Sequence, residues 1–369
     1  MAMADSQRVT LKAWSDLAAR IGVVTRQGMI GLIRQKYGAR SGTLSAGALV
    51  LANVGTMTAE FAGIAAAGQL FGLSKYVSVP VAAIAVSFLV LRNSFSTVEK
   101  VFFIVSAGFI AYIIAGFMAG PDWGAAAKGV LIPTIPFTQE AIFIATATIG
   151  TTLAPWGLAF IQSYAVDKRL TNDDLKLLRV DVWTGSLLTG VIGFFVVVTC
   201  AATLHKQGIH INDAADAAKA LEPLVQGFPH AGTIAKILFA IGVIGMGLLG
   251  IPVLAGSVAY AVSDAFNWRE GLDYKLKEAK QFYGVIIFST VAGWVITLVG
   301  IDPIKSLVFA AVINGLVAVP LIFLIARISR NKEVMGELTG KGLSRTMLNI
   351  AFVVMLLCAL MLIGTTIFS

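Results

Sequence analysis

The chain has 369 residues, of which 57% are hydrophobic and only 13% are charged, and its formal net charge is +8. Soluble domains carry about 25% charged residues, so this composition leaves too little polar surface to cover a water-facing globule. It excludes a soluble enzyme, a nucleic-acid-binding protein and a disordered chain. We therefore expect an all-α polytopic membrane protein whose surroundings are the lipid bilayer and whose oligomeric state is a monomer.

The chain divides into an N-terminal segment, residues 1–42, and a transmembrane domain, residues 43–368. Within the first, residues 15–37 show a helical period with basic residues on one side, which predicts a cytoplasmic connecting helix or an interfacial helix. A spanning helix needs roughly 17–25 mostly apolar residues. Nine segments satisfy this, at about 43–73, 76–92, 100–118, 139–165, 179–204, 233–264, 282–300, 303–327 and 346–368.

The basic residues alternate between the loops that join these nine segments. One set of loops holds 20 of the 28 Lys and Arg residues and the opposite set holds 6. Cytoplasmic loops carry an excess of Lys and Arg, so the strongly basic set, together with the N-terminal segment, is predicted to be cytoplasmic. The expected location is the plasma or inner membrane.

The fourth predicted span contains the sequence IGTTLAPWGLAFIQ, with Gly150, Thr151, Thr152, Pro155 and Gly157 near its centre. A proline inside a helix removes one N–H donor and clashes with the preceding turn. Broken helices within a membrane are tolerated where they are buried or line a cavity, and in transporters they mark the binding site. The pattern indicates an ion or substrate site here, and a simple proline kink is the alternative.

The first predicted span carries Glu60, the one clear acidic residue deep inside a predicted span. A carboxyl group at membrane depth is costly, which favours a role in proton relay or cation attraction. A protonated side chain bonded to a neighbouring helix is the alternative. Asn53 lies on the same helix and is predicted to join the polar network of Glu60.

One further polar side chain, Asn314, falls inside the span at 303–327. A buried amide either binds a neighbouring helix or serves as a ligand. Asp181 and Asp264 lie near the ends of their spans and are expected to be interfacial. The sequence contains no metalloprotease, hydrolase or P-loop motif, so it predicts no enzyme and no cofactor.

Several of these motifs resemble those of the Nramp divalent metal transporters, and more closely the Nramp-related magnesium transporters. The segment 149–156 resembles the sixth helix of that family, which carries Met-Pro-His after a run of small residues, and Ala59-Glu60 looks like the Ala-Glu of its third helix. AARIGVVTRQGM and GIPVLAGSVAYAVSDAFNWREGLD are similar to further segments of the family.

The resemblance implies a LeuT-like inverted-repeat fold in which the nine spans correspond to family helices three to eleven. On this reading the chain is N-terminally truncated and lacks the first two helices. It also implies an ion site at the break, with the Thr151 carbonyl and the Ala154 position facing the metal beside Pro155. Ala154 stands where the family has its methionine, Trp156 stands where it has histidine, and Asn314 falls near a polar position of helix ten.

The expected function is divalent cation transport by alternating access, with Mg²⁺ and Mn²⁺ as cargo. Because a thioether favours softer metals, an alanine at position 154 favours an oxygen-lined site with room for hydrated Mg²⁺. The loss of the histidine predicts uptake that is not coupled to protons. A transporter of another small solute and a fragment that does not transport are the alternatives.

Overall fold

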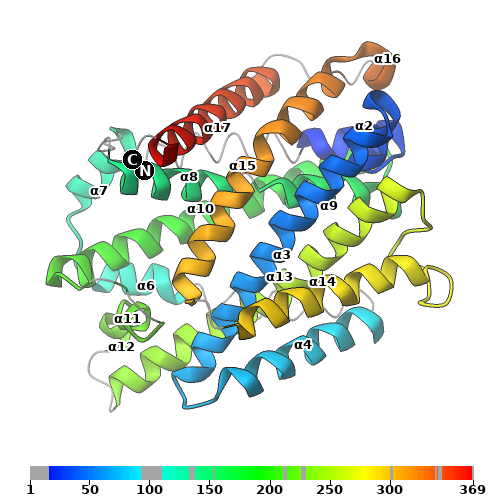
Figure 1. Ribbon diagram of the computed structural model, residues 1–369. Helices are drawn as coiled ribbons and strands as arrows, with labels where there is room; N and C mark the ends of the chain where they lie inside the picture. Colours follow the sequence, from blue (N-terminus) through cyan, green and yellow to red (C-terminus); the bar gives the residue numbers. More distant parts are fainter. Residues whose placement is uncertain are drawn as a thin grey trace.

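The computed structural model describes residues 16–92, 110–132, 138–152, 154–209, 211, 214–225, 230–299, 302–336, 339 and 343–367. These residues form helices joined by short connections (Figure 1). The first described helix covers 16–25. The others are α2 (Met29–Tyr37), α3 (Ala39–Gln69), α4 (Lys75–Arg92), α6 (Ile110–Met118), α7 (Trp123–Leu131), α8 (Gln139–Thr152), α9 (Pro155–Asp167), α10 (Asp174–Thr203), η1 (His205–Gln207), α11 (Ala214–Lys219), α12 (Glu222–Val225), α13 (Ala231–Phe266), α14 (Lys280–Leu298), α15 (Pro303–Arg330), α16 (Lys332–Met335) and α17 (Leu343–Ile367).

Six of the described stretches are long and apolar enough to cross a membrane. The predicted span at 76–92 corresponds to α4 and that at 346–368 to α17, each apolar over a shorter described stretch, whereas most of the span at 100–118 lies outside the described residues. The total of nine spans stays a prediction. The six stretches are Ala39–Gln69, Gln139–Asp167, Asp174–Gln207, Ala231–Phe266, Lys280–Leu298 and Ile304–Arg330.

Helix α3 is the central element and packs against α2, α4, α13, α14 and α15. Its second half is rich in Ala and Gly, which lets neighbouring backbones approach closely. A Cβ added to Gly63 would lie 3.1 Å from Val243 of α13, and one added to Gly247 of α13 would lie 2.7 Å from Ile64. Small residues on both helices therefore produce the α3–α13 interface.

The segment at 15–37 forms two helices, 16–25 and α2, instead of one. The chain turns between them at Arg26, whose φ is +54°. Leu17, Ile21 and Ile33 are buried in a core with α15 and α17, so the apolar face of this segment packs within the protein.

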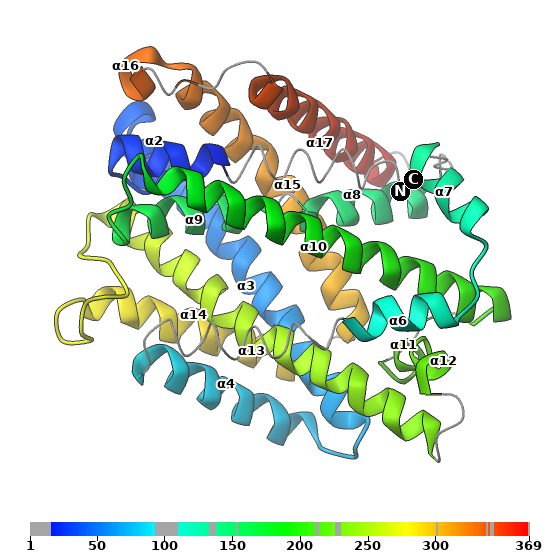
Figure 2. The same cartoon turned by 180° about the vertical axis from the view of Figure 1, so that it is seen from behind.

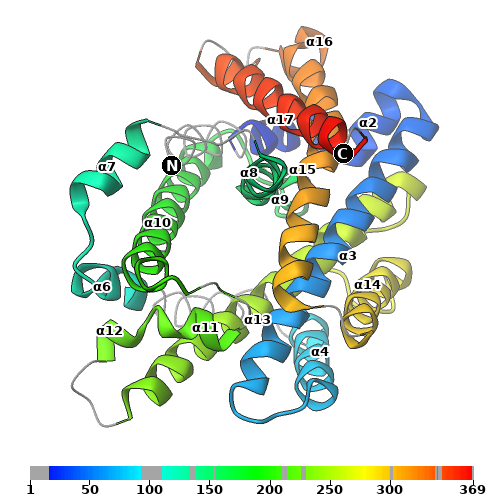
Figure 3. The same ribbon diagram turned by 60° about the vertical axis from the view of Figure 1, so that its left-hand side comes forward.

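Several of the described basic segments lie toward one end of the molecule. Figures 1 and 2 place α2, α16 and the loop after α13 toward one end of the molecule, and α11 and α12 toward the other. Figure 3 shows α6, α7 and α10 on the opposite side of the molecule from α3, α4 and α14. We call the end that carries α2 and α16 the basic end.

Candidate functional site

The span at 139–167 is broken, as the sequence predicts. Helix α8 ends at Thr152 and α9 begins at Pro155, with Ala154 in an extended conformation before it. The carbonyl of Thr151 would accept a helical hydrogen bond from the amide of residue 155, but proline has no N–H. The break therefore leaves a backbone oxygen without its helical donor, between the negative end of α8 and the positive end of α9.

The two threonines at the end of α8 hold its last turn. The hydroxyls of Thr151 and Thr152 both donate to the carbonyl of Thr148, each over 2.9 Å. A threonine hydroxyl that donates to a carbonyl in the preceding turn tends to bend a helix. Here the Thr148 carbonyl has these hydroxyls as hydrogen-bond donors. Both hydroxyls therefore point back along α8, and the Thr151 carbonyl lies at the break.

Helices α8 and α15 touch through their backbones beside the break. A Cβ added to Gly150 would lie 2.2 Å from the carbonyl oxygen of Ala311 and 2.7 Å from the amide nitrogen of Gly315. A side chain at position 150 would push the two helices apart. The contact sets Asn314, the neighbour of Gly315, next to the broken helix.

Two buried asparagine side chains, one on α3 and one on α15, each have a side-chain oxygen without a hydrogen-bond partner among the described residues. The Asn314 side chain is 2% exposed, and its Nδ2 donates to the Thr56 hydroxyl over 2.7 Å and to the Ala310 carbonyl over 3.0 Å. The Asn53 side chain is fully buried, and its Nδ2 donates to the carbonyl of Leu254 over 3.3 Å. Both Oδ1 atoms are buried without a hydrogen-bond partner among the described residues. A buried oxygen in this state is costly unless a donor, a water or a cation satisfies it.

One turn of α13 forms hydrogen bonds both with Asn53 of α3 and with the start of α9. Leu254 accepts the hydrogen bond from Asn53, and the hydroxyl of Ser257, three residues later, donates to the carbonyl of Trp156 over 3.2 Å. Residues three apart on a helix lie on the same face. The structure thus brings α3, α9 and α13 together around Asn53 and Trp156, while α8 and α15 meet at Gly150.

Glu60 of α3 lies against α13, one helical turn before Leu254. A Cβ added to Gly250 of α13 would be 3.5 Å from the Glu60 carboxyl carbon, and Gly250 precedes Leu254 by one helical turn. No described residue forms a salt bridge with Glu60. The glycine provides the space that this partly buried carboxyl group occupies.

The seven residues singled out from the sequence thus fall into three parts of the structure. Ala154 is partly buried and Pro155 buried at the break, where Thr151 is exposed. Asn314 lies on α15, which contacts α8 at Gly150, and Asn53 bonds to Leu254 of α13. Glu60 lies beside Gly250 of α13, one turn before Leu254. Ser257 and Gly315 have no signal in the sequence, because their importance depends on which helices pack together. No three or more His, Cys, Asp or Glu side chains in the described ranges are grouped to hold a metal ion.

Comparisons with known proteins agree with this architecture. Residues 9–365 match the family model Nramp, described as natural resistance-associated macrophage protein-like. A relative named divalent metal cation transporter MntH, from Caldanaerobacter subterraneus subsp. tengcongensis, is 27% identical over 271 residues. That match covers 71% of this chain and 60% of the relative, so the chain spans less than two thirds of that relative's length.

Solved structures show the fold. The crystal structure of the Eremococcus coleocola manganese transporter in complex with an aromatic bis-isothiourea substituted compound superimposes with a TM-score of 0.75 at 18% identity, covering 99% of this chain and 79% of that one. MhsT in complex with L-phenylalanine gives a TM-score of 0.56 at 14% identity, covering 95% and 89%. The chain has the LeuT-like fold that the sequence predicted.

Proposed function

Because the chain belongs to the Nramp family, whose members are transporters and not enzymes, we propose that it is a divalent metal cation transporter. Its cargo is Mg²⁺ and Mn²⁺, and the ion moves by alternating access around the break between α8 and α9. The observation that carries this proposal is the pair of buried, unpartnered amide oxygens of Asn53 and Asn314 beside a helix whose Thr151 carbonyl has no helical donor.

The chemistry of the break supports hard cations. Residues 151–156 are Thr-Thr-Leu-Ala-Pro-Trp and include no thiol, thioether or imidazole. Carbonyl, amide and hydroxyl oxygens suit Mg²⁺ and Mn²⁺, whereas softer ligands favour later transition metals. The small Ala154 side chain leaves room for the waters that Mg²⁺ retains.

Oxygen dipoles alone do not balance the two positive charges of the ion, so the site needs a negatively charged group. Glu60 is the candidate for that group. We propose that it attracts the cation electrostatically from its place beside Gly250. With tryptophan at position 156, where the family resemblance puts histidine, we propose uptake that is driven by the membrane potential and is not coupled to protons. The basic end then faces the cytoplasm, in accordance with the distribution of Lys and Arg.

The decisive experiment is uptake by the purified chain in proteoliposomes. An imposed inside-negative potential is expected to drive entry of Mn²⁺, and external Mg²⁺ is expected to compete with it. Asn314→Leu is expected to reduce entry, and Asn172→Leu, at an exposed position before α10, serves as the matched control. Entry that Mg²⁺ does not affect would contradict the selectivity, and entry of a neutral amino acid instead of metal would favour the alternative solute.

An internal pH dye tests the coupling. If the uptake is uncoupled, Mn²⁺ entry leaves the internal pH unchanged while the potential is clamped. Acidification that follows Mn²⁺ entry would show that protons accompany the metal.

A further inference from the structure

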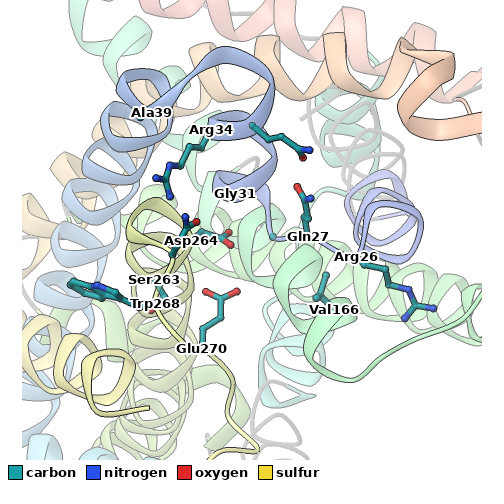
Figure 4. Close-up of a pocket in the computed structure, with 13 residues that line it drawn as sticks. Arg26, Gln27, Gly31, Arg34, Ala39, Val166, Ser263, Asp264, Trp268 and Glu270 are labelled. Atoms are coloured by element: carbon teal, nitrogen blue, oxygen red, sulfur yellow. The ribbon is translucent and has the colours of Figure 1, made fainter. Parts of the chain in front are cut away.

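A second polar region lies at the basic end, apart from the residues assigned to the ion site. A cavity of about 600 Å³ lies between α2, the end of α9 and the end of α13 (Figure 4). Four polar atoms on its wall are buried without a described hydrogen-bond partner: Arg34 Nη1, Ser263 Oγ, Asp264 Oδ2 and Glu270 Oε2. The two carboxyl groups point toward one another in Figure 4.

Asp264 of α13 caps the start of α2 from outside that helix. The residue before α2 is Gly28, which has no side chain to accept the first amides. The Asp264 carboxyl group lies there instead, against Gly28 and Gly31, where the unpaired backbone N–H groups of the first turn point. A carboxylate is stabilised there by the exposed amides and the dipole of the helix.

Glycine is required for this cap. A Cβ added to Gly28 would lie 2.1 Å from Asp264 Oδ2, and one added to Gly31 would lie 2.9 Å from Oδ1. The φ of Gly28 is −66°, which any residue adopts, so the need for glycine comes from the carboxyl group and not from the backbone conformation.

Glu270, in the loop after α13, lines the same cavity as Asp264, and its carboxyl group points toward Asp264 (Figure 4). Two adjacent, partly buried carboxylates repel one another, and one of them keeps its proton unless a cation lies between them. Because the described residues supply no third acidic, His or Cys ligand, the proton is the better fit. Burial, then the charges of Asp264 and Asp167, raise the pKa of Glu270 from its ordinary 4.5 to about 10.

Charged groups approach Glu270 from three sides. Arg26 and Arg34 line the same cavity from the α2 side. Asp167, at the end of α9, accepts hydrogen bonds from the Tyr260 hydroxyl over 2.7 Å and from the Leu272 amide over 3.1 Å. A neighbouring cavity, which Glu270 also lines, adds Lys168, Arg169 and Asp273, and Lys168 pairs with Asp273 over 3.3 Å.

The same junction is tied to the broken helix. Gln162 of α9 donates from Nε2 to the carbonyl of Gln27 over 3.0 Å, directly before the cap at Gly28. Helix α9 begins at the break, so a movement of α9 pulls on the residue next to the cap. The basic end therefore links α2, α9 and α13 through Gln27, Gly28 and Asp264.

We propose that Asp264 and Glu270 share a proton that fastens α2 to the end of α13. Opening of the basic end breaks this latch and releases the proton to the cytoplasm, and the pair takes a proton back from the same side when it closes, so that no proton crosses the membrane. This role rests on the transport proposed above. Asp264 and Glu270 are positioning residues and do not touch the cargo. Because opening exposes the pair to water, a higher cytoplasmic pH favours the open state.

Labelling with a membrane-impermeant maleimide tests the latch without requiring transport. In a chain with Cys200→Ser and Cys358→Ser, Gln27→Cys reports access to the cavity. Lys277→Cys, at an exposed position, corrects for the pH dependence of the reagent. The corrected labelling rate is expected to rise by at most about tenfold per pH unit between pH 6 and 9, because one proton is released. In Glu270→Gln the side chain is neutral and does not titrate, so the corrected labelling rate is expected not to change with pH.

Glu278→Gln, at an exposed site in the same loop, is the matched control and is expected to behave as the parent chain. A Glu270→Gln variant that keeps the parental pH dependence would overturn the latch. Uptake of Mn²⁺ at varied internal pH gives the second readout, with the same flattening expected in the variant. Failure of all uptake, with pH-dependent labelling intact, would contradict the transport proposal and leave the latch standing.

Discussion

Gly150 of α8 and Gly315 of α15 lie against one another with no space for a side chain at position 150. A Cβ there would be 2.9 Å from the Gly315 Cα and closer still to the Ala311 carbonyl oxygen. Gly150→Ala is therefore expected to force the helices apart, at a cost of about 1–3 kcal/mol. A lower melting temperature in detergent and slower Mn²⁺ uptake would follow. Gly185→Ala in α10, where an added Cβ meets nothing within 4 Å, is the control and is expected to leave both unchanged. A Gly150→Ala variant as stable as the parent chain would refute the close contact.

The Asn314 oxygen gives a second prediction. Asn314→Leu removes the free Oδ1 and the hydrogen bond to Thr56, and is expected to reduce Mn²⁺ uptake at limiting concentration by about tenfold. Thr56→Val removes the same hydrogen bond but leaves the amide oxygen, so its smaller effect separates the two contributions. Equal losses in both variants would show that Asn314 acts as a link between helices and not as a ligand.

Selectivity is predicted to depend on position 154. Ala154→Met adds a thioether at the break, which favours Mn²⁺ relative to Mg²⁺ because sulfur binds softer ions. Competition of the two metals for uptake measures this, and the concentration of Mg²⁺ needed to halve Mn²⁺ entry is expected to rise. Ala201→Met, on an exposed face of α10, controls for the added methionine. An unchanged competition curve would remove Ala154 from the selectivity argument.

The cap at α2 makes a prediction about stability. Gly28→Ala is expected to expel the Asp264 carboxyl group and to lower the melting temperature, since loss of a helix cap costs about 1 kcal/mol and the displaced carboxyl group adds to it. Gly47→Ala in α3, where the added Cβ meets nothing within 4 Å, is expected to be neutral or slightly stabilising. If Gly28→Ala were as harmless as Gly47→Ala, Asp264 would not be the cap.

The pH dependence of stability follows from Glu270. Its pKa is raised to about 10 in the folded chain from an ordinary value of 4.5, so the folded state holds a proton that the unfolded chain has lost. The stabilisation is full below about pH 4.5 and is lost progressively as the pH rises toward 10, by up to about 1.4 kcal/mol per pH unit. The melting temperature is thus expected to fall between pH 6 and 9 in the parent chain and to fall less in Glu270→Gln. Parallel curves for the two proteins would contradict the shared proton.

The sequence predicts the parts of this fold that depend on local chemistry. The excess of apolar residues predicts the helices, and Pro155 together with the small residues before it predicts the break, because these effects act within one turn of chain. The family resemblance predicts the LeuT-like fold.

The remaining features depend on partners that are distant in sequence. The expectation that Asp264 is interfacial does not reveal that it lies at the start of α2, more than 200 residues away, and the local sign is a helix that starts after a glycine. Ser257 and Gly315 matter for the same reason, since each acts on a helix that the sequence does not identify. The segment at 15–37 has one continuous period, whereas its turn at Arg26 follows from packing against α15 and α17.

The missing donor at Pro155 is a property of covalent structure. Hydroxyls and amides can rotate toward other partners when helices move, but no rearrangement of the chain supplies an N–H at a proline nitrogen. The Thr151 carbonyl therefore keeps its electron pairs available in every conformation through which the molecule passes. A residue with an N–H at position 155 would allow α8 and α9 to close into one uninterrupted helix, and the two facing helix ends would disappear.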